Sequence, residues 1–103
     1  MNIIETEKIN QLLDIYQDLL TPYQRKIMTD YFQEDLSLKE IAENNNISRN
    51  AVFSLIKRVE KIIKNYENKL HLLEKQEKIN NIIENCGNCT KEQLVEKIKK
   101  INE

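Results

Sequence analysis

The segment from Arg49 to Asn85 contains neither proline nor glycine, and this absence restricts the possible folds more than any other feature. The whole chain of 103 residues has one of each, Pro22 and Gly87. So few turn formers leave little material for β-hairpins or glycine-rich phosphate loops. The abundant residues are Ile, Asn, Lys, Glu and Leu, mostly good helix formers. The sequence therefore predicts an all-α protein, and its length predicts a single domain over residues 1–103.

Apolar residues recur at alternating spacings of four and three along this segment, as in a seven-residue repeat. They are Val52, Ile56, Val59, Ile63, Tyr66, Leu70 and Leu73. The repeat predicts one long helix over about 49–85, with a bend near 75–78, where the pattern slips. Such a helix would extend about 55 Å. We expect the last helix to fold back along it and a second copy to pack against it in a homodimer. The alternative is a monomer whose first helix covers the repeat.

Local capping signals mark the starts of the other helices, because Ser and Thr side chains accept hydrogen bonds from the free amides of a first helical turn. The signals are Thr21-Pro22, Ser37 with Glu40, Ser48, and Thr90 with Gln93. They predict helices over about 5–20, 22–33, 37–43 and 90–102, besides the long one. The expected core of the first two helices includes Leu19 and Tyr23.

A helix-turn-helix is predicted over about 37–61, where a short capped helix, a turn at 44–46 and a second capped helix follow one another. Small Ala42 allows the two helices to approach closely. We expect Ile47 to fill the turn, and Val52 and Leu55 to anchor the second helix on the first. Asparagine suits the turn because it tolerates left-handed backbone angles better than most residues.

The opposite face of the second helix carries cationic and polar side chains that can contact phosphates and base edges. The candidate nucleic-acid-binding residues are Arg49, Asn50, Phe53, Ser54, Lys57, Arg58 and Lys61. Phe53 is expected to touch a thymine methyl group or a base, or to pack on a neighbouring chain. Two alternatives stay open: a merely solvated cationic face, and a helix-turn-helix that docks a protein. Four cations give weak, salt-sensitive binding from a single copy.

The formal net charge of −1 excludes a uniformly basic nucleic-acid-binding protein. The charge is unevenly distributed, however, with net −4 over residues 1–35, +3 over 36–75 and zero over 76–103. An anionic partner is therefore expected to meet the middle third of the chain.

Several other classes of protein are disfavoured. No stretch approaches the roughly 20 apolar residues that cross a bilayer, and the N-terminus lacks the order of a signal peptide, so we expect a cytoplasmic protein. No phosphate loop, nucleophile–base arrangement or metal-ligand cluster is visible, so we expect no enzyme, cofactor or metal.

Cys86 and Cys89 form one CxxC pair, which is read as a redox pair, half of a zinc site shared in a dimer, or, preferably, two small residues in a turn. His71 is expected to be a surface or interface histidine.

The segment LSLKEIAENNNISRNAVFSLIKRVEKI resembles the helix-turn-helix of sigma-factor region 4. More closely, LLTPYQRKIMTDYFQEDLSLKEIAE followed by ISRNAVFSLIKRVEKIIKNYENKLHLLEK resembles the YlxM family of small bacterial proteins. The resemblance extends from about Asn10 to Lys75 and fades over the last thirty residues. In related motifs the turn position of Asn46 is usually glycine, and asparagine is the mildest substitute for it.

The resemblance implies an all-helical dimer with a sigma region 4-like helix-turn-helix. The apolar repeat and the capping signals add a long C-terminal helix and a final short helix to this expectation. It also implies a DNA-binding regulatory protein, and gene neighbourhoods in the family connect that role with the signal recognition particle pathway. Two alternatives are an adaptor that binds signal recognition particle GTPases through the acidic first helices, and a binder of structured RNA.

Overall fold

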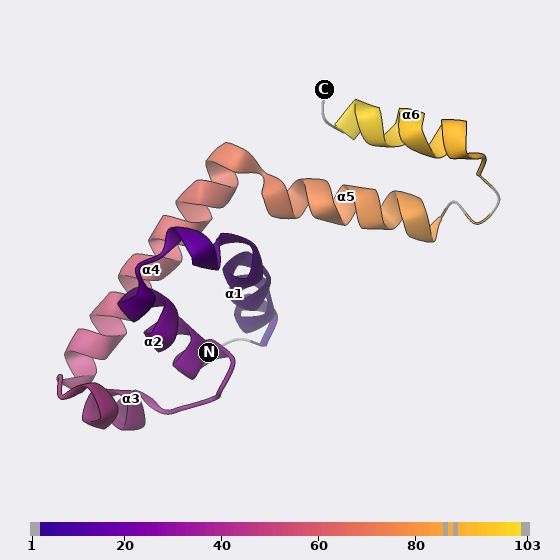
Figure 1. The fold of residues 1–103 in the computed structure, drawn as a ribbon. Helices are drawn as coiled ribbons and strands as arrows, with labels where there is room; N and C mark the ends of the chain where they lie inside the picture. Colours follow the sequence, from indigo (N-terminus) through magenta and orange to yellow (C-terminus); the bar gives the residue numbers. More distant parts are fainter. Residues whose placement is uncertain (1–2, 86, 88, 102–103) are drawn as a thin grey trace. The chain divides into compact units, whose positions relative to one another are not determined.

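The computed structural model describes residues 3–85, 87 and 89–101. Over these residues every regular element is a helix, which confirms the all-α prediction (Figure 1). The elements are α1 (Ile3–Tyr16), the 3₁₀-helix η1 (Gln17–Leu19), α2 (Pro22–Phe32), α3 (Leu38–Asn45), α4 (Arg49–Leu70), α5 (Leu72–Glu84) and α6 (Lys91–Ile101). No helix in this described part combines the length and apolar character needed to cross a membrane.

Contacts within the chain group it into two compact units, Met1–Lys69 and Leu70–Glu103. The first unit holds α1 to α4 except for Leu70, the last residue of α4, and the second holds α5 and α6. Each unit is described by itself below. This grouping describes contacts within the chain and does not test whether residues 1–103 fold as one domain. The expectation of a single domain therefore stays a prediction.

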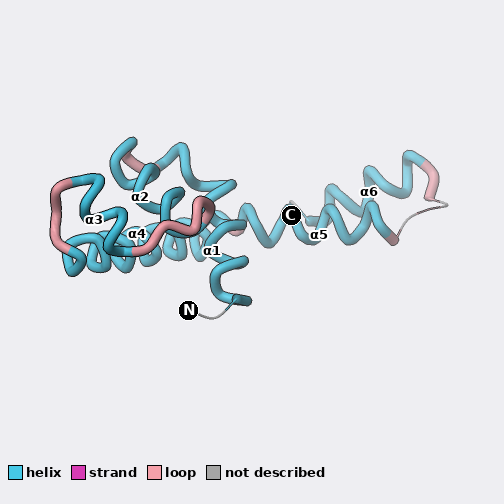
Figure 2. Tube along the Cα trace, turned by 90° about the horizontal axis from the view of Figure 1, so that it is seen from below, coloured by secondary structure: helices cyan, strands magenta, loops and turns pink. Residues whose placement is uncertain are grey.

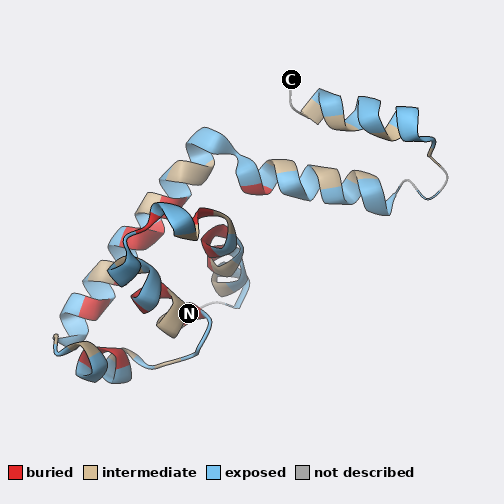
Figure 3. Ribbon diagram, viewed as in Figure 1, coloured by how far each residue is buried: buried red, intermediate tan, exposed pale blue. Residues whose placement is uncertain are grey.

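The hydrophobic core lies in the first unit, where α4 contributes one apolar stripe and α1 to α3 supply the rest (Figure 3). The buried apolar residues of this unit are Ile9, Leu12, Leu13, Tyr16, Leu20, Ile27, Met28, Phe32, Ile41, Ala42, Val52, Ile56, Val59 and Ile63. The four from α4 follow the predicted spacing of four, three and four. Burial of such a stripe is the main reason that an amphipathic helix docks on its neighbours.

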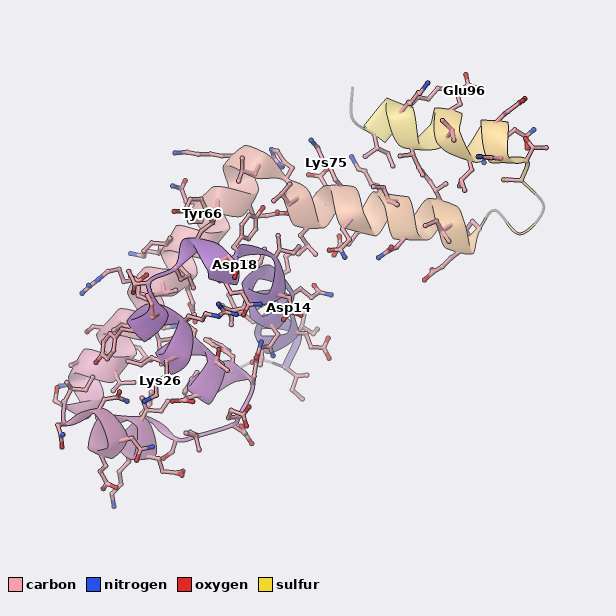
Figure 4. All side chains as sticks on the ribbon, viewed as in Figure 1. Asp14, Asp18, Lys26, Tyr66, Lys75 and Glu96 are labelled. Carbon is pink, nitrogen blue, oxygen red and sulfur yellow. The ribbon has the colours of Figure 1, made fainter. Side chains whose placement is uncertain are left out.

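Tyr16 joins the end of α1 to the C-terminal end of α4. Its side chain is fully buried, and its hydroxyl donates a hydrogen bond of 2.7 Å to Oε1 of Glu67. Its ring also stacks on that of Tyr66, labelled in Figure 4, with the ring centroids 5.9 Å apart. The phenol thus adds an apolar ring and a charged hydrogen bond to the same contact.

Two residues expected in the core, Leu19 and Tyr23, are exposed instead, by 55% and 45%. The first helix was expected to continue to about residue 20, but α1 ends at Tyr16 and η1 follows. A 3₁₀-helix has three residues per turn, so it rotates the following side chains away from the face that an α-helix would give them. Leu20 is buried beyond η1, with its amide donating to the Gln17 carbonyl at 3.1 Å.

The segment predicted as one helix over about 49–85 is divided at His71, which differs from the expected bend near 75–78. His71 has left-handed backbone angles, with φ 54° and ψ 32°. This conformation ends the helical hydrogen-bond pattern, and histidine adopts it more readily than most residues with a Cβ. Nδ1 of His71 lies 3.1 Å from Oε2 of Glu74, and Nζ of Lys78 lies 3.1 Å from Oε1 of the same carboxylate. The hydrogen bond and charge of Lys78, followed by the charge of His71, lower the pKa of Glu74.

The second unit is a helical hairpin in which α6 runs back beside α5 (Figures 1 and 2). Thr90 and Gln93 form the predicted capping box at the start of α6, with hydrogen bonds of 3.2 and 3.1 Å. Ile79, Ile82, Leu94 and Ile98 are only half-buried, and no residue of α6 described by the structure is buried. Two helices alone therefore leave much of their apolar side in water.

Replacement of Tyr16 by phenylalanine tests the link between α1 and α4. We expect Tyr16→Phe to lower the free energy of unfolding by about 1–2 kcal/mol, because it leaves the Glu67 carboxylate without its phenol donor. Urea unfolding followed by circular dichroism measures the change. Tyr23→Phe is the matched control, since Tyr23 is exposed, and an equal effect of the two substitutions would contradict the assigned role.

Candidate nucleic-acid interface

The first helix of the predicted motif, α3, begins with the expected capping box. The Ser37 hydroxyl accepts a hydrogen bond from the Glu40 amide at 3.1 Å. The Glu40 carboxylate accepts one from the Ser37 amide at 3.3 Å. Two backbone donors at the start of the helix are therefore satisfied by one pair of side chains, as the sequence predicts.

The turn between α3 and α4 depends on Asn46, which has left-handed backbone angles of φ 55° and ψ 42°. The Asn46 amide donates to the Glu43 carbonyl at 3.4 Å, and the Ile47 amide donates to the Ala42 carbonyl at 3.1 Å. These two bonds are the Schellman arrangement that closes many helix C-termini. The turn therefore reverses the chain within a few residues without glycine.

Ser48 then starts α4, because its hydroxyl accepts a hydrogen bond of 3.0 Å from the Ala51 amide. The side chains that hold α3 and α4 together are arranged much as predicted. Ala42 and Val52 are buried, and Ile47 and Leu55 are half-buried. The turn and the start of α4 are thus fixed to the core of the first unit.

All seven candidate contact residues lie on α4 and are exposed: Arg49, Asn50, Phe53, Ser54, Lys57, Arg58 and Lys61. The side chains of Arg49, Asn50 and Phe53 also line a shallow depression with Leu38 and Ser48. The structure therefore brings the start of α4 and one residue of α3 to a common surface. Cationic, amide and aromatic side chains on one such surface can contact phosphates, base edges and base faces.

The four cations of this face are not equivalent. Nζ of Lys57 lies 3.6 Å from Oε2 of Glu60 and 5.5 Å from the centroid of the Phe53 ring. Among the residues that the structure describes, Arg49, Arg58 and Lys61 are seen in no ion pair. Three cations are therefore available to an anionic partner, while the fourth already has a carboxylate beside it.

Glu60 was not among the residues selected from the sequence. It is the one buried charged residue of the described chain, with 6% exposure, and it lies on the apolar side of α4 between Val59 and Ile63. The sequence does show that Glu60 follows Lys57 by three residues. On a helix this spacing places the two side chains next to each other, so an ion pair between them could have been predicted. Nothing in the sequence distinguishes this glutamate from an exposed one.

The remaining candidates of the sequence do not form a site in the described residues. Cys86 lies outside them, so all readings of the CxxC pair stay predictions. His71 is exposed and lies at the break between α4 and α5. No group of three or more His, Cys, Asp or Glu side chains there is arranged to hold a metal ion.

The capped helix α3, the left-handed turn at Asn46 and the exposed polar face of α4 define a helix-turn-helix protein. A family model described as "Putative helix-turn-helix protein, YlxM / p13 like" matches residues 3–103. The chain belongs to this family, UPF0122.

Relatives with high similarity have been found in several bacteria. A UPF0122 protein of Oceanobacillus iheyensis is 44% identical over 100 residues, covering 96% of this chain and 95% of the relative. One of Exiguobacterium sp. is 49% identical over 77 residues, 75% of this chain and 72% of the relative. One of Geobacillus kaustophilus is 49% identical over 80 residues, 78% of this chain and 73% of the relative. The family prediction is confirmed.

Substitution of Asn46 tests the backbone requirement of the turn. Alanine has no side chain that compensates for left-handed angles, so we expect Asn46→Ala to lower the free energy of unfolding by about 1–2 kcal/mol. Asn46→Gly should retain or raise it. Urea unfolding provides the measurement, with Asn44→Ala in the last turn of α3 as the control. Equal stabilities of the alanine and glycine variants at residue 46 would disprove the requirement.

Ser48 tests the cap of α4 separately. We expect Ser48→Ala to lower the free energy of unfolding by about 1 kcal/mol, because the Ala51 amide loses its acceptor. Ser48→Asp should preserve stability, since aspartate is an equally good N-cap residue. Thermal unfolding at neutral pH measures both variants, and the same loss from both would show that the hydroxyl is not acting as a cap.

Proposed function

We propose that this protein is a DNA-binding regulator that places the exposed face of α4 against nucleic acid. Arg49, Arg58 and Lys61 would contact phosphates, and Asn50, Phe53 and Ser54 would face the bases. This assignment follows the general division in which phosphate contacts position a protein and base contacts specify the sequence. The role would be cytoplasmic and non-enzymatic.

This proposal rests on three cationic side chains of α4 that are exposed and have no ion-pair partner among the described residues. Arg49, Arg58 and Lys61 are exposed on a helix whose other face is buried, and the described residues offer them no ion pair. Side chains held in this way can release the counterions of nucleic-acid phosphates when they bind. A cationic face satisfied by its own carboxylates would lack that driving force.

Two alternatives have support of their own. Structured RNA offers the same phosphates in another geometry, so the same cations would serve. A protein-binding adaptor would use the acidic first helices, since residues 1–35 carry a net charge of −4. The resemblance to the YlxM family connects either role with the signal recognition particle, its RNA or its GTPases.

We further propose that the protein acts as a homodimer. The half-buried apolar side chains of α5 and α6 leave a surface that a second copy would cover. Dimerisation would also double the number of phosphate contacts, and weak single-copy binding makes that gain important.

Fluorescence anisotropy with labelled duplex DNA, and separately with signal recognition particle RNA, tests nucleic-acid binding. We expect salt-sensitive binding that Arg49→Ala/Arg58→Ala weakens by at least tenfold at 0.1 M salt, because two phosphate contacts are removed. Lys99→Ala/Lys100→Ala in α6 is the matched control, since it removes the same charge from the second unit. The better ligand identifies the class of nucleic acid.

Two results would contradict the nucleic-acid proposal. One is the absence of binding to both ligands at low salt and high protein concentration. The other is equal weakening by the α4 and α6 variants, which would mean that only net charge matters. Binding to a signal recognition particle GTPase in the same assay, unaffected by the α4 variant, would support the adaptor instead.

Sedimentation velocity over a range of protein concentrations tests the homodimer. Leu72 and Ile83 are exposed by 43% and 55% and lie about three helical turns apart on one side of α5. We expect the wild-type protein to sediment as a dimer and Ile83→Glu to shift it towards the monomer, because a buried unpaired carboxylate is costly. Glu77→Gln is the control in the same helix. A wild-type protein that stays monomeric throughout would exclude the dimer.

A further inference from the structure

The arrangement of Glu60, Lys57 and Phe53 is more specific than a surface ion pair. The Glu60 side chain is 8% exposed and that of Lys57 is 47% exposed. A carboxylate held out of water at this depth needs a compensating charge, since its desolvation is otherwise unfavourable. Lys57 supplies that charge from the turn before, with its ammonium 3.6 Å from the Glu60 carboxylate.

The ring of Phe53 also lies near the same ammonium. Nζ of Lys57 lies 5.5 Å from the centroid of the Phe53 ring, within the range of a cation–π interaction. The ammonium of Lys57 thus has both an anion and a ring face near it. The arginines and the lysine at 49, 58 and 61 have no such partners in the described part of the chain.

We infer that Glu60 is a positioning residue that cancels the charge of Lys57 and so withholds it from nucleic-acid phosphates. The inference rests on the proposed nucleic-acid-binding function of α4 and describes how its affinity is limited. Arg49, Arg58 and Lys61 supply the counterion release of each copy. The ammonium of Lys57 is held near Glu60 and Phe53, so Lys57 contributes no counterion release.

The consequence is a measurable difference in salt dependence. Each phosphate contact on duplex DNA contributes about −0.9 to the slope of log affinity against log salt concentration. Loss of the Glu60 charge frees Lys57, so the slope should steepen by about 0.9 per bound copy. The same change corresponds to about an eightfold gain in affinity at 0.1 M salt.

The experiment is a double-mutant cycle in the full chain, with a labelled random-sequence DNA duplex as the probe and anisotropy measured at several salt concentrations. Glu60→Gln should steepen the slope and strengthen binding. Lys57→Ala alone should leave the slope unchanged, whereas Lys61→Ala should reduce it by about 0.9. Combining Glu60→Gln with Lys57→Ala should restore the wild-type slope. Glu77→Gln in α5 is the control for net charge.

A purely structural role of Glu60 gives a different pattern, in which thermal unfolding changes but the slope does not. That result, or a slope that Lys57→Ala reduces as much as Lys61→Ala does, would overturn the inference while leaving nucleic-acid binding intact. If Glu60→Gln does not fold, Glu60→Met removes the same charge and fills the buried position with an apolar chain. Failure of the wild type and of every folded variant to bind DNA or RNA would overturn the proposed function together with this inference.

Discussion

The fold of the first unit depends on the burial of one stripe of α4 by α1, α2 and α3. Val52, Ile56, Val59 and Ile63 form that stripe, and Tyr16 adds a ring and a hydrogen bond beside it. Because an α-helix has 3.6 residues per turn, burial of these positions sends the residues between them to the opposite face. The exposure of the candidate contact residues therefore follows from the packing of the core, and no separate element is needed to present them.

The features that were predicted correctly from the sequence are those determined within a few residues. The capping boxes at Ser37 and Thr90 need only a hydroxyl, a carboxylate or amide three residues later, and the free amides of a first turn. The left-handed turn at Asn46 depends in the same way on a side chain that tolerates positive φ. Since these bonds are local, sequence spacing is sufficient to identify them, and with them the helix-turn-helix.

The features that were missed depend on backbone geometry or on distant neighbours. An apolar repeat specifies which face of a helix is buried but says nothing about a single residue with left-handed angles, so the division at His71 was hidden by an unbroken pattern. The exposure of Leu19 follows from a short 3₁₀ segment. Apolar residues three and four apart are compatible with an α-helix and with this segment, so the sequence did not distinguish them. The burial of Glu60 required knowledge of what covers α4, because its sequence neighbours are compatible with either environment.

The charges of α4 also explain why a second copy would matter for this protein. Under the proposed function, three available cations would correspond to a salt-dependence slope of about −2.7 for one copy, which would be weak binding at physiological salt. Two copies on one nucleic acid would give about −5.4, so that affinity would depend steeply on association between chains. The limited charge of α4 would make a second copy useful for binding. The half-covered apolar side of α5 and α6 would give that second copy a surface to pack against. If the protein binds nucleic acid as proposed, binding through paired copies would respond to protein concentration, and this dependence would suit a regulatory protein better than a constitutive binder.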